Sequence, residues 1–518
     1  MPEKKTSVSV YRLRNGGRSA LESRFPNRTQ LRGAFDGWFH LLPPNDKTPP
    51  WLLAISPYLP SPGAPNIQSL VHGALALVCR QSAEFVLSFG FAWQFLEDAW
   101  LEPEFGRRVV LNAVPPQKIL ELNSEQVFAQ RHVARERSPK PTTFSAFGVE
   151  LDRDLVSAVE GISTKPIFGG VIRGATSLRM KIPLATLPAA LDETEVLFGS
   201  NAYKKKYPDI DSLTPVIDQT LSSQLDDLLD AEMKSGRADR HMTMCAPSFR
   251  RGEMDSASSF VMGRMSKNPA TSAYLEYSAW KFHLRSAGKS PSVSAAKVTR
   301  IHMLDESGTE FDTRTVYDCF GYEVDLNGET FVLSSGLWYR TDTSFAKSIE
   351  SAIASLKPTA IHLPPATPGE NEGPYNKRCC CASDLILMDR RIVHYGGNQS
   401  KFEFCDFLHL KKKTLFCAKI PTSSSDCSHL TEQSRRTLEL FFSSDPGFRQ
   451  RAKKVMNKYH PNVNTSWLDS RPKPGDWTMC LILIRKSASD LPLFARCSIA
   501  RLGKYCDEHG HPFRVQTV

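Results

Sequence analysis

The chain has 518 residues, of which 41% are hydrophobic, 10% aromatic and 23% charged. This is the composition of a folded protein, so a disordered chain is excluded, and the length predicts about three domains. The longest apolar runs, Ala74–Cys79 and Met479–Ile484, fall short of the ~20 residues that span a bilayer, and the start MPEKKTSVSV lacks the apolar segment of a secretory signal. We therefore expect a cytoplasmic protein without a membrane partner, in which the twelve cysteines do not form a disulfide framework.

The net charge of +10 is concentrated at one end of the chain. Residues 371–518 contain 24 Lys and Arg against 14 Asp and Glu, whereas the first 370 residues contain 41 of each. Nine of the twelve cysteines also lie at or after Cys379. A solvated basic surface and a domain that faces nucleic acid are the two explanations for such an excess. If this protein handles nucleic acid, the sequence places that role after residue 371 and leaves residues 1–370 to dock a target or a partner protein.

Residues 1–140 are expected to form an α+β domain. Alternation and apolar runs predict strands at Val8–Tyr11, Phe85–Gly90 and Arg108–Asn112, with a helix over Ala92–Trp100. The segment 135–143, RERSPKPTT, has the composition of a linker.

Residues 141–240 are expected to be mostly helical. A helix is predicted to begin at Asp152, and apolar residues at spacings of three and four predict short helices between Leu184 and Leu229, interrupted by prolines. Between them, Phe168–Gly174 contains the pattern GGxxxG. It lacks the lysine of a P-loop and the spacing of a dinucleotide-binding motif, so we interpret these glycines as backbone geometry and not as phosphate binding.

Residues 241–360 predict a second α+β domain. Strands over Val316–Val324 and Thr330–Leu333 flank Asn327-Gly328, a strong signal for a β-hairpin. An amphipathic helix is predicted over Phe345–Leu356, and the Pro-rich residues 357–376 mark the next boundary.

The basic residues 371–518 predict a mixed sheet with flanking helices. Three strands come first, a long helix follows with Ser428 as its N-cap, and a strand, a helix and a last strand then complete the sheet. The expected strands are Leu385–Met388, Phe402–Asp406, Thr414–Lys419, Met479–Ile484 and Phe513–Val515, with a later helix over Phe494–Asp507. The expected fold class of the whole chain is therefore α+β / α/β with several domains.

Three strands followed by a helix resemble the restriction-endonuclease-like nuclease fold. In that fold an Asp on one strand faces an acid-x-Lys motif on its neighbour, and Asp406 and Lys419 occupy corresponding places in this sequence. A carboxylate there binds a divalent metal that polarises a phosphate and activates water, and a lysine stabilises the developing charge. We therefore expect Mg²⁺ or Mn²⁺ as cofactor, with Asp406 and Glu372 as metal ligands.

The match to this motif is incomplete, because Cys417 stands where the second acid is expected and sulfur is a poor ligand for Mg²⁺. Glu403 is one candidate for the missing carboxylate, although it needs a β-bulge to share a face with Asp406. Glu372 is another, if a helix precedes the strands. The alternatives are an inactive nuclease-like binder and a plain salt bridge between Asp406 and Lys419.

Gln433 and His429 lie one turn apart on the predicted helix and are candidates for supporting groups. A nucleophilic pair of Cys417 and His429 has no local support. Candidate contacts to nucleic acid are the basic side chains on the turn between strands and on the two helices that follow. They are Lys411, Lys412, Lys413, Arg435, Arg436, Arg451, Lys453 and Lys454.

Zinc is not expected as a cofactor. Cys379-Cys380-Cys381 is a single run, and no CxxC pair exists in the chain. Cys506, His509 and His511 have the wrong spacing for a standard zinc finger. Most of these cysteines are therefore interpreted as small core residues.

Taken together, these motifs resemble the sporadically distributed bacterial family of unknown function, about 520–580 residues long, that occurs in mobile and genomic-island settings. The resemblance runs nearly from end to end and implies, by association, a role in conflict with phage or plasmids. The segments that carry it are Phe85–Gly90, Phe105–Asn112, Phe147–Glu150 with Asp154, Gly336–Tyr339, Glu372–Asn376, Phe402–Asp406, Lys419, Ser428–Leu430 with Gln433, and Leu491–Phe494.

The expected function is a divalent-metal-dependent nuclease that acts in defence against phage or plasmids, on DNA in preference to RNA. One alternative is a non-catalytic nucleic-acid-binding or regulatory protein that uses the basic domain alone. A second is a structural, partner-binding protein of a phage or mobile-element assembly. The sequence leaves the oligomeric state open.

Overall fold

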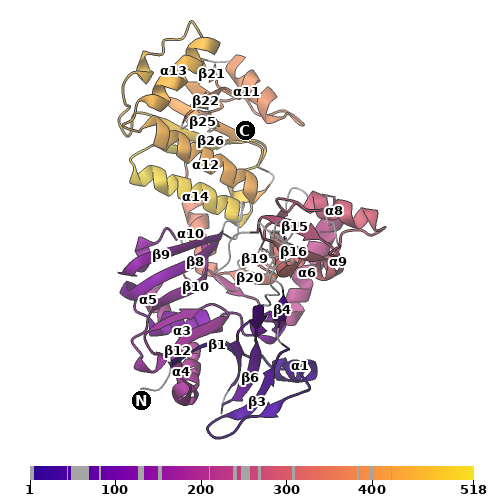
Figure 1. The fold of residues 1–518 in the computed structure, drawn as a ribbon. Helices are drawn as coiled ribbons and strands as arrows, with labels where there is room; N and C mark the ends of the chain where they lie inside the picture. The colour runs from indigo at the N-terminus through magenta and orange to yellow at the C-terminus, as the bar shows by residue number, and fades with distance from the viewer. Residues whose placement is uncertain are drawn as a thin grey trace, which may run out of the picture.

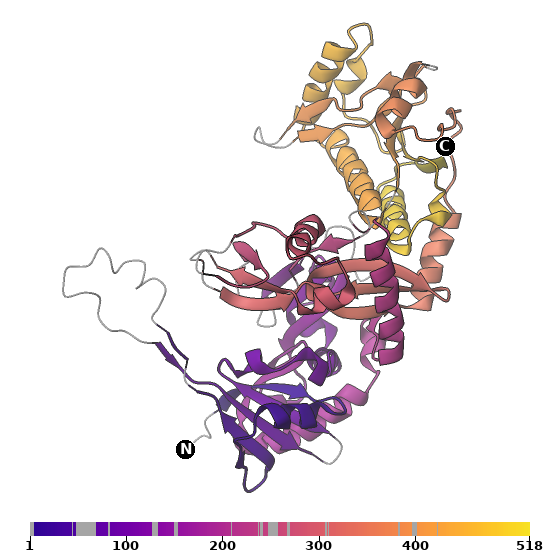
Figure 2. The same ribbon diagram turned by 90° about the vertical axis from the view of Figure 1, so that its right-hand side faces the viewer.

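The structure is a computed structural model with helices and several sheets, so the α+β class is confirmed. Figures 1 and 2 show an elongated molecule in which an N-terminal sheet, a middle region and a C-terminal domain follow one another. Within the described residues, no helix has both the length and the apolar character to cross a bilayer. The structure describes residues 5–43, 45–47, 69–80, 83–126, 133–149, 154–208, 210–236, 238, 242–246, 257–266, 270–305, 308, 310–381, 384–395, 401–421 and 423–518.

The N-terminal part is built on one ten-stranded antiparallel sheet in the order β2-β3-β6-β7-β1-β12-β11-β10-β8-β9. Val8 and Val10 point to the face on which helices α3 and α4 pack, while Ser7 and Ser9 lie on the opposite face. The strands are β1 Lys5–Arg12, β2 Thr29–Gln30, β3 Asp36–Leu41, β6 Ala74–Cys79, β7 Glu84–Phe89, β8 Ile119–Gln126, β9 Val133–Thr142, β10 Asp154–Ile162, β11 Val171–Gly174 and β12 Ser177–Pro183. The helices are α1 Gly17–Arg24, α3 Phe105–Ala113, α4 Leu187–Gly199 and α5 Tyr203–Lys206, and β4 Asn45–Lys47 pairs with β5 Ser69–Val71.

The strand predicted at Arg108–Asn112 is wrong, because these residues belong to α3. Almost every residue of α3 is buried, so the helical period is hidden, and the β-branched pair Val109 and Val110 mimics a strand. The helix crosses the sheet very closely: a Cβ at Gly174 would lie 2.0 Å from the carbonyl oxygen of Gly106. Close backbone packing therefore explains this end of the glycine-rich pattern, as expected.

Two further predictions in this part are wrong. The predicted linker 135–143 lies mostly within β9, the last strand of the sheet, where Pro139 and Pro141 are tolerated because an edge strand need not donate every hydrogen bond. The predicted helix after Asp152, a residue outside the described ones, is instead β10, which pairs with β8 and β11. The segment Ala92–Trp100 forms two short 3-10 turns, Ala92–Phe95 and Asp98–Trp100.

The middle region contains two smaller sheets. The predicted hairpin is confirmed: β18 and β19 pair across Asn327 and Gly328, whose φ angles of 55° and 81° suit a tight turn. A five-stranded sheet has the order β13-β20-β19-β18-β14, and a three-stranded sheet has the order β15-β16-β17. The elements are β13 Leu213–Pro215, α6 Gln219–Lys234, β14 Thr243–Met244, β15 Ser259–Met262, α8 Tyr277–Ser286, α9 Val293–Val298, β16 Arg300–Leu304, β17 Glu310–Thr315, β18 Phe320–Leu326, β19 Glu329–Ser334, β20 Leu337–Thr341 and α10 Thr343–Ala354.

The C-terminal domain has a five-stranded mixed sheet in the order β21-β24-β25-β26-β27. The first three strands are antiparallel, and β25, β26 and β27 run parallel. Helix α11 contributes to the core on one face of this sheet, and α12 and α14 contribute to the core on the other. The elements are α11 Glu372–Cys381, β21 Ile386–Leu387, β22 Ile392–His394, β23 Lys401–Glu403, β24 Phe407–His409, β25 Thr414–Lys419, α12 Ser424–Phe441, α13 Gly447–Tyr459, β26 Thr478–Leu483, α14 Leu493–Glu508 and β27 Phe513–Thr517.

Helix α12 begins one turn earlier than predicted. Its N-cap is Ser423, which forms a capping box with Asp426, so the prediction of Ser428 as the cap is wrong. Ser428 instead lies inside the helix, and its hydroxyl is 2.8 Å from that of Ser498 on α14.

Two carboxylates, Glu125 and Glu323, join the three parts of the molecule. Glu125 on β8 accepts a hydrogen bond of 2.7 Å from Ser334 in the middle region. Glu323 on β18 accepts hydrogen bonds from the Ser424 hydroxyl at 2.8 Å and from the Phe494 N–H at 3.3 Å, both in the C-terminal domain. These hydrogen bonds connect the neighbouring parts of the molecule seen in Figure 1.

Candidate metal centre

Asp406 lies directly before β24 and is held on all sides. One carboxylate oxygen accepts a hydrogen bond of 2.8 Å from the Ala418 N–H on β25, and the other accepts one of 3.2 Å from the Asn376 side-chain amide on α11. Its own carbonyl oxygen accepts the N–H groups of Met388 and Asp389, each at 2.7 Å. The side chain is therefore fixed in position, with only 8% of the residue exposed.

Three carboxylates meet at this position. Ligand oxygens of Asp389, Glu403 and Asp406 all lie within 4.8 Å of one another, and no other such group of three His, Cys, Asp or Glu side chains occurs among the described residues. The β22–β23 hairpin is inserted between β21 and β24, so Glu403 at its end returns to the point where Asp389 leaves β21. Carboxylate oxygens are the ligands that Mg²⁺ and Mn²⁺ prefer.

The surroundings of the group disfavour negative charge. Burial raises the pKa of Asp406 to about 8, against the hydrogen bond from Ala418, and the nearby charges of Glu403, Asp389 and Glu372 add to the increase. Burial also raises the pKa of Glu403. A divalent cation among these oxygens would remove the repulsion between like charges and favour the ionised forms.

Asn376 supplies a second observation that points to a ligand at this position. The residue is 1% exposed, and its Nδ2 donates to Asp406, whereas its Oδ1 has no hydrogen-bond partner among the described residues. A buried amide oxygen without a partner costs free energy, and a bound ion or water commonly satisfies such a group. Amide oxygen is also an acceptable ligand for a hard cation, so the donors at this position fit Mg²⁺ or Mn²⁺.

Lys419, the last residue of β25, is paired with Glu372 at the start of α11. Its Nζ lies 3.4 Å from Glu372, whose Oε1 also accepts the Ile420 N–H at 2.9 Å. A direct salt bridge between Lys419 and Asp406, the structural alternative considered from the sequence, is not formed. Glu372 lies beside the three-carboxylate group without belonging to it, close enough for its charge to raise the pKa of Asp406.

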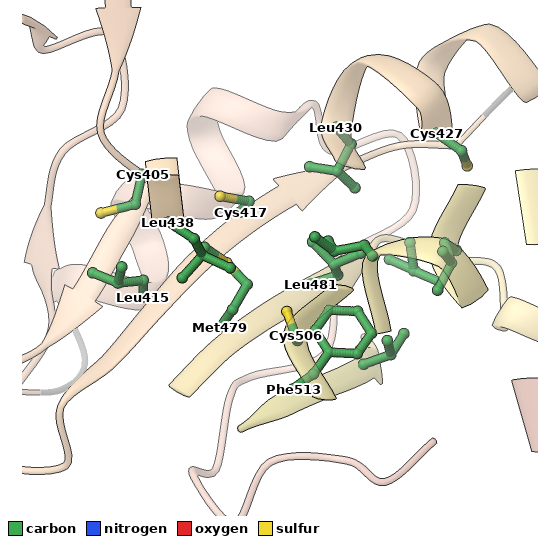
Figure 3. Packing of buried hydrophobic residues seen from close by; sticks show 14 of the residues in the cluster. Cys405, Leu415, Cys417, Cys427, Leu430, Leu438, Met479, Leu481, Cys506 and Phe513 are labelled. Atoms are coloured by element: carbon green, nitrogen blue, oxygen red, sulfur yellow. The ribbon is translucent and has the colours of Figure 1, made fainter. Parts of the chain in front are cut away.

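Cys417 is a core residue. Figure 3 shows its side chain in the apolar cluster with Leu415, Leu430 and Leu438, and the residue is 0% exposed. Burial raises the pKa of its thiol, which opposes the thiolate form that a nucleophile needs. His429, the suggested partner for such a nucleophile, is exposed, and none of its described contacts reaches the three-carboxylate group.

Gln433 contacts the group through Glu403. Its side chain hydrogen-bonds this carboxylate, which also accepts the backbone N–H of Arg390. Asp389 was missed from the sequence, although it directly follows an apolar strand beside the predicted site. Its carboxylate approaches the start of α11, since a Cβ at Gly373 would lie 3.4 Å from Asp389 Oδ2.

The predicted basic surface is partly neutralised by neighbouring acids. Lys411 pairs with Asp384, Lys413 with Asp476 and Lys453 with Asp469. Arg435 and Arg436 both pair with Glu439, and Arg451 donates to the carbonyl oxygen of His394 at 2.7 Å. Lys412 and Lys454 are exposed and form no ion pair within the described residues.

The geometry defines a mixed α and β protein with a partly buried, acidic candidate metal centre. The chain belongs to the family of unknown function DUF6119, whose model matches residues 8–518. This match confirms the family membership expected from the sequence motifs. No curated protein and no solved structure matches the chain.

Proposed function

We propose that the C-terminal domain is a divalent-metal-dependent nuclease domain of restriction-endonuclease-like architecture. Its order of elements supports this: helix α11, the antiparallel strands β21, β24 and β25, helix α12, and then β26 parallel to β25. Glu372, Asp406, Lys419 and Gln433 lie on the helix, strand edge, strand and helix where that architecture places its site. The single observation that carries the proposal is the convergence of Asp389, Glu403 and Asp406 on one point.

In this proposal Asp389, Glu403 and Asp406 hold Mg²⁺ or Mn²⁺, and Asp389 and Glu403 replace the acid that Cys417 does not supply. The bound metal would polarise a phosphate oxygen and lower the pKa of a water. Asn376 and the Ala418 N–H orient Asp406, and Gln433 orients Glu403. Lys419, held by Glu372, places a positive charge beside the three-carboxylate group where a phosphate would enter.

The substrate proposed is foreign DNA, and the biological role is defence against phage or plasmids. The excess of basic residues after residue 371 supports a polyanionic substrate. Lys412 and Lys454 are the exposed lysines of the predicted set that neighbouring acids do not engage within the described chain. The first 370 residues, with equal numbers of acidic and basic side chains, would then recognise the trigger or a partner protein.

The experiment compares cleavage of supercoiled plasmid and of RNA by the wild-type protein and Asp406→Asn, with Mg²⁺ or Mn²⁺ and with EDTA. We expect metal-dependent cleavage by the wild type and its loss in D406N. The matched control is Asp384→Asn, which removes a carboxylate in the same domain that pairs with exposed Lys411. Equal cleavage by the wild type and D406N removes Asp406 from the mechanism.

A second candidate function is metal-dependent binding of nucleic acid without cleavage. The observation that favours it is the position of Cys417 in the core, because the usual second acid is then absent from its strand. In that case the wild type binds DNA with a steep salt dependence and shows no turnover with either metal.

A further inference from the structure

The N-terminal sheet contains a cavity that the nuclease proposal does not use. It has a volume of about 240 Å³ and lies over β7, β1, β12 and β11. Ser7 and Ser9 line it, so it opens on the face opposite α3 and α4, which cover the side of Val8 and Val10. In Figure 1 this sheet lies at the other end of the molecule from the candidate metal centre.

Among the described residues, the wall of the cavity contains hydrogen-bond donors and no carboxylate. Four serines, two arginines, three aromatic residues and two small residues form its wall. Cross-strand pairing aligns the polar ones in a row, in which Ser88 faces Ser9, Ser9 faces Arg179, and Arg179 faces Arg173. Hydroxyl and guanidinium groups arranged in this way suit an anion that accepts several hydrogen bonds.

The charges of the two arginines in the wall also favour an anion in the cavity. Arg173 and Arg179 are directly opposite each other on β11 and β12, and both line the cavity. Arg173 is anchored from the far side by Glu121 and Glu160, so its carboxylate partners approach from β8 and β10 and not from the cavity. An anion bound in the cavity would lie next to both guanidinium groups.

Ser88 has an unused hydroxyl in this wall. The residue is 6% exposed, and its Oγ has no hydrogen-bond partner among the described residues. A buried hydroxyl without a partner is unfavourable, and a bound acceptor would satisfy it. This observation is independent of the charges on the two arginines.

The remaining wall is aromatic. Tyr11, Phe89 and Trp93 line the cavity, with Trp93 on the 3-10 turn Ala92–Phe95 that follows β7. Flat aromatic walls favour a planar ring by stacking, as they do for nucleobases.

We propose that this cavity binds a small phosphorylated ligand with a planar ring, of the chemical class of nucleoside monophosphates. The phosphate lies against Arg179, Ser9 and Ser88, and the ring lies against Trp93. The volume of about 240 Å³ is of the order of one nucleotide. The proposal stands on the N-terminal sheet alone and does not depend on nuclease activity.

Isothermal titration calorimetry on the full chain tests the proposal with AMP, GMP, CMP and UMP, and with inorganic phosphate and adenosine as separate arms. We expect at least one nucleotide to bind at least tenfold more tightly than either fragment. Arg179→Met should weaken that binding at least tenfold. The matched control is Arg300→Met, which changes an exposed arginine on strand β16 of another sheet.

Ser88→Ala provides a variant that should fold normally, because the Ser88 hydroxyl forms no hydrogen bond with a described group. We expect it to retain the melting temperature of the wild type and to weaken nucleotide binding at least threefold. Absence of binding by all four nucleotides at millimolar concentration overturns the proposal. Equal affinity of the wild type and R179M also overturns it, and equal affinity for phosphate and nucleotide overturns the role of the aromatic wall.

Discussion

The ten-stranded sheet and the sheet of the C-terminal domain each have a buried carboxylate, and the neighbours of the two carboxylates differ in charge. Glu121 on β8 is 0% exposed, and Arg135, Arg137 and Arg173 surround it, with Arg135 at 2.9 Å. Burial alone would raise the pKa of Glu121, but the hydrogen bonds and charges of these arginines outweigh burial and lower it. Asp406 is 8% exposed and has acidic neighbours, so burial raises its pKa to about 8.

The difference in neighbouring charges distinguishes a carboxylate with a structural role, Glu121, from a carboxylate in a candidate binding site, Asp406. A buried carboxylate must be neutralised, by a proton, by a cation of the protein or by a cation from outside. The chain supplies arginines for Glu121, whereas the described residues around Asp406 supply neutral donors and more carboxylates. In the proposed function, a divalent cation from solution supplies the positive charge that the described residues around Asp406 do not.

The largest effect is expected for Asp389, the carboxylate that only the structure assigns to the group. Asp389→Asn should lower metal-dependent cleavage by roughly a hundredfold or more, because it removes a proposed ligand of the metal. Initial rates on plasmid at saturating Mn²⁺ measure this, with D384N as the control. If D389N cleaves at the wild-type rate, Asp389 is not a ligand of the metal and only Glu403 and Asp406 remain in the group.

Substitution of the two buried carboxylates should change stability in opposite directions. Glu121→Gln leaves the arginines around it without their anion and should cost about 2–3 kcal/mol, since some of these partners are partly exposed. Asp406→Asn removes a disfavoured charge and should leave stability unchanged or higher at pH 9. Urea unfolding measures both, and Glu97→Gln at the exposed pair with Arg24 is the control. If D406N loses as much stability as E121Q, the two carboxylates do not differ in the way proposed.

Glu323 is an intermediate case. It lies at the interface with the C-terminal domain, where it accepts hydrogen bonds from neutral donors. Burial raises its pKa to about 7 despite hydrogen bonds from Ser424 and Phe494. Its stabilising contribution is thus complete below its unfolded pKa of about 4.3 and is lost as the pH rises through about 7. Thermal melts at pH 5 and pH 8 should show a loss of about 1–2 kcal/mol in the wild type that is smaller in Glu323→Gln. An identical pH dependence in both proteins would exclude Glu323 as its source.

The smallest effect is the stabilisation by metal itself. At five times the dissociation constant, Mg²⁺ or Mn²⁺ should stabilise the wild type by about 1 kcal/mol, and EDTA should reverse this. D406N should not be stabilised by the metal. E121Q should still be stabilised, because its substitution is in the other sheet. A melting temperature that EDTA leaves unchanged would count against a bound metal.

Sequence reasoning was most accurate where the chain has strong local patterns. The strand at β1, the hairpin at Asn327-Gly328 and the strands β25, β26 and β27 follow from alternation and turn residues. The strand predicted over Phe402–Asp406 is wrong, because β23 ends at Glu403 in a separate two-stranded sheet and the main sheet contains β24, Phe407–His409, instead. Helix α3 and strand β9 were missed for tertiary reasons, since burial hides the helical period of one and a sheet edge accommodates the prolines of the other.

The site shows the same limit. The structure brings Glu403, one of the two candidates for the missing carboxylate, to Asp406, and Gln433 to Glu403, whereas the pairing of Lys419 with Glu372 does not follow from the spacing of residues. Asp389 could not be assigned because it reaches the group through the path of the β22–β23 hairpin. The position of Cys417 between sheet and helix likewise depends on packing that spacing along the chain does not encode.

Helix α10 has a practical consequence for dividing the protein. Ile349 and Ile353 belong to the same buried cluster as the β25 and α14 side chains, and the carbonyl oxygen of Lys357 accepts the N–H of Val515 on the last strand at 3.1 Å. A fragment cut at residue 371 would leave these groups behind and expose apolar surface of the remaining domain to water. A fragment that starts at Asp342, the N-cap of α10, keeps them and is the shorter chain that we expect to fold independently.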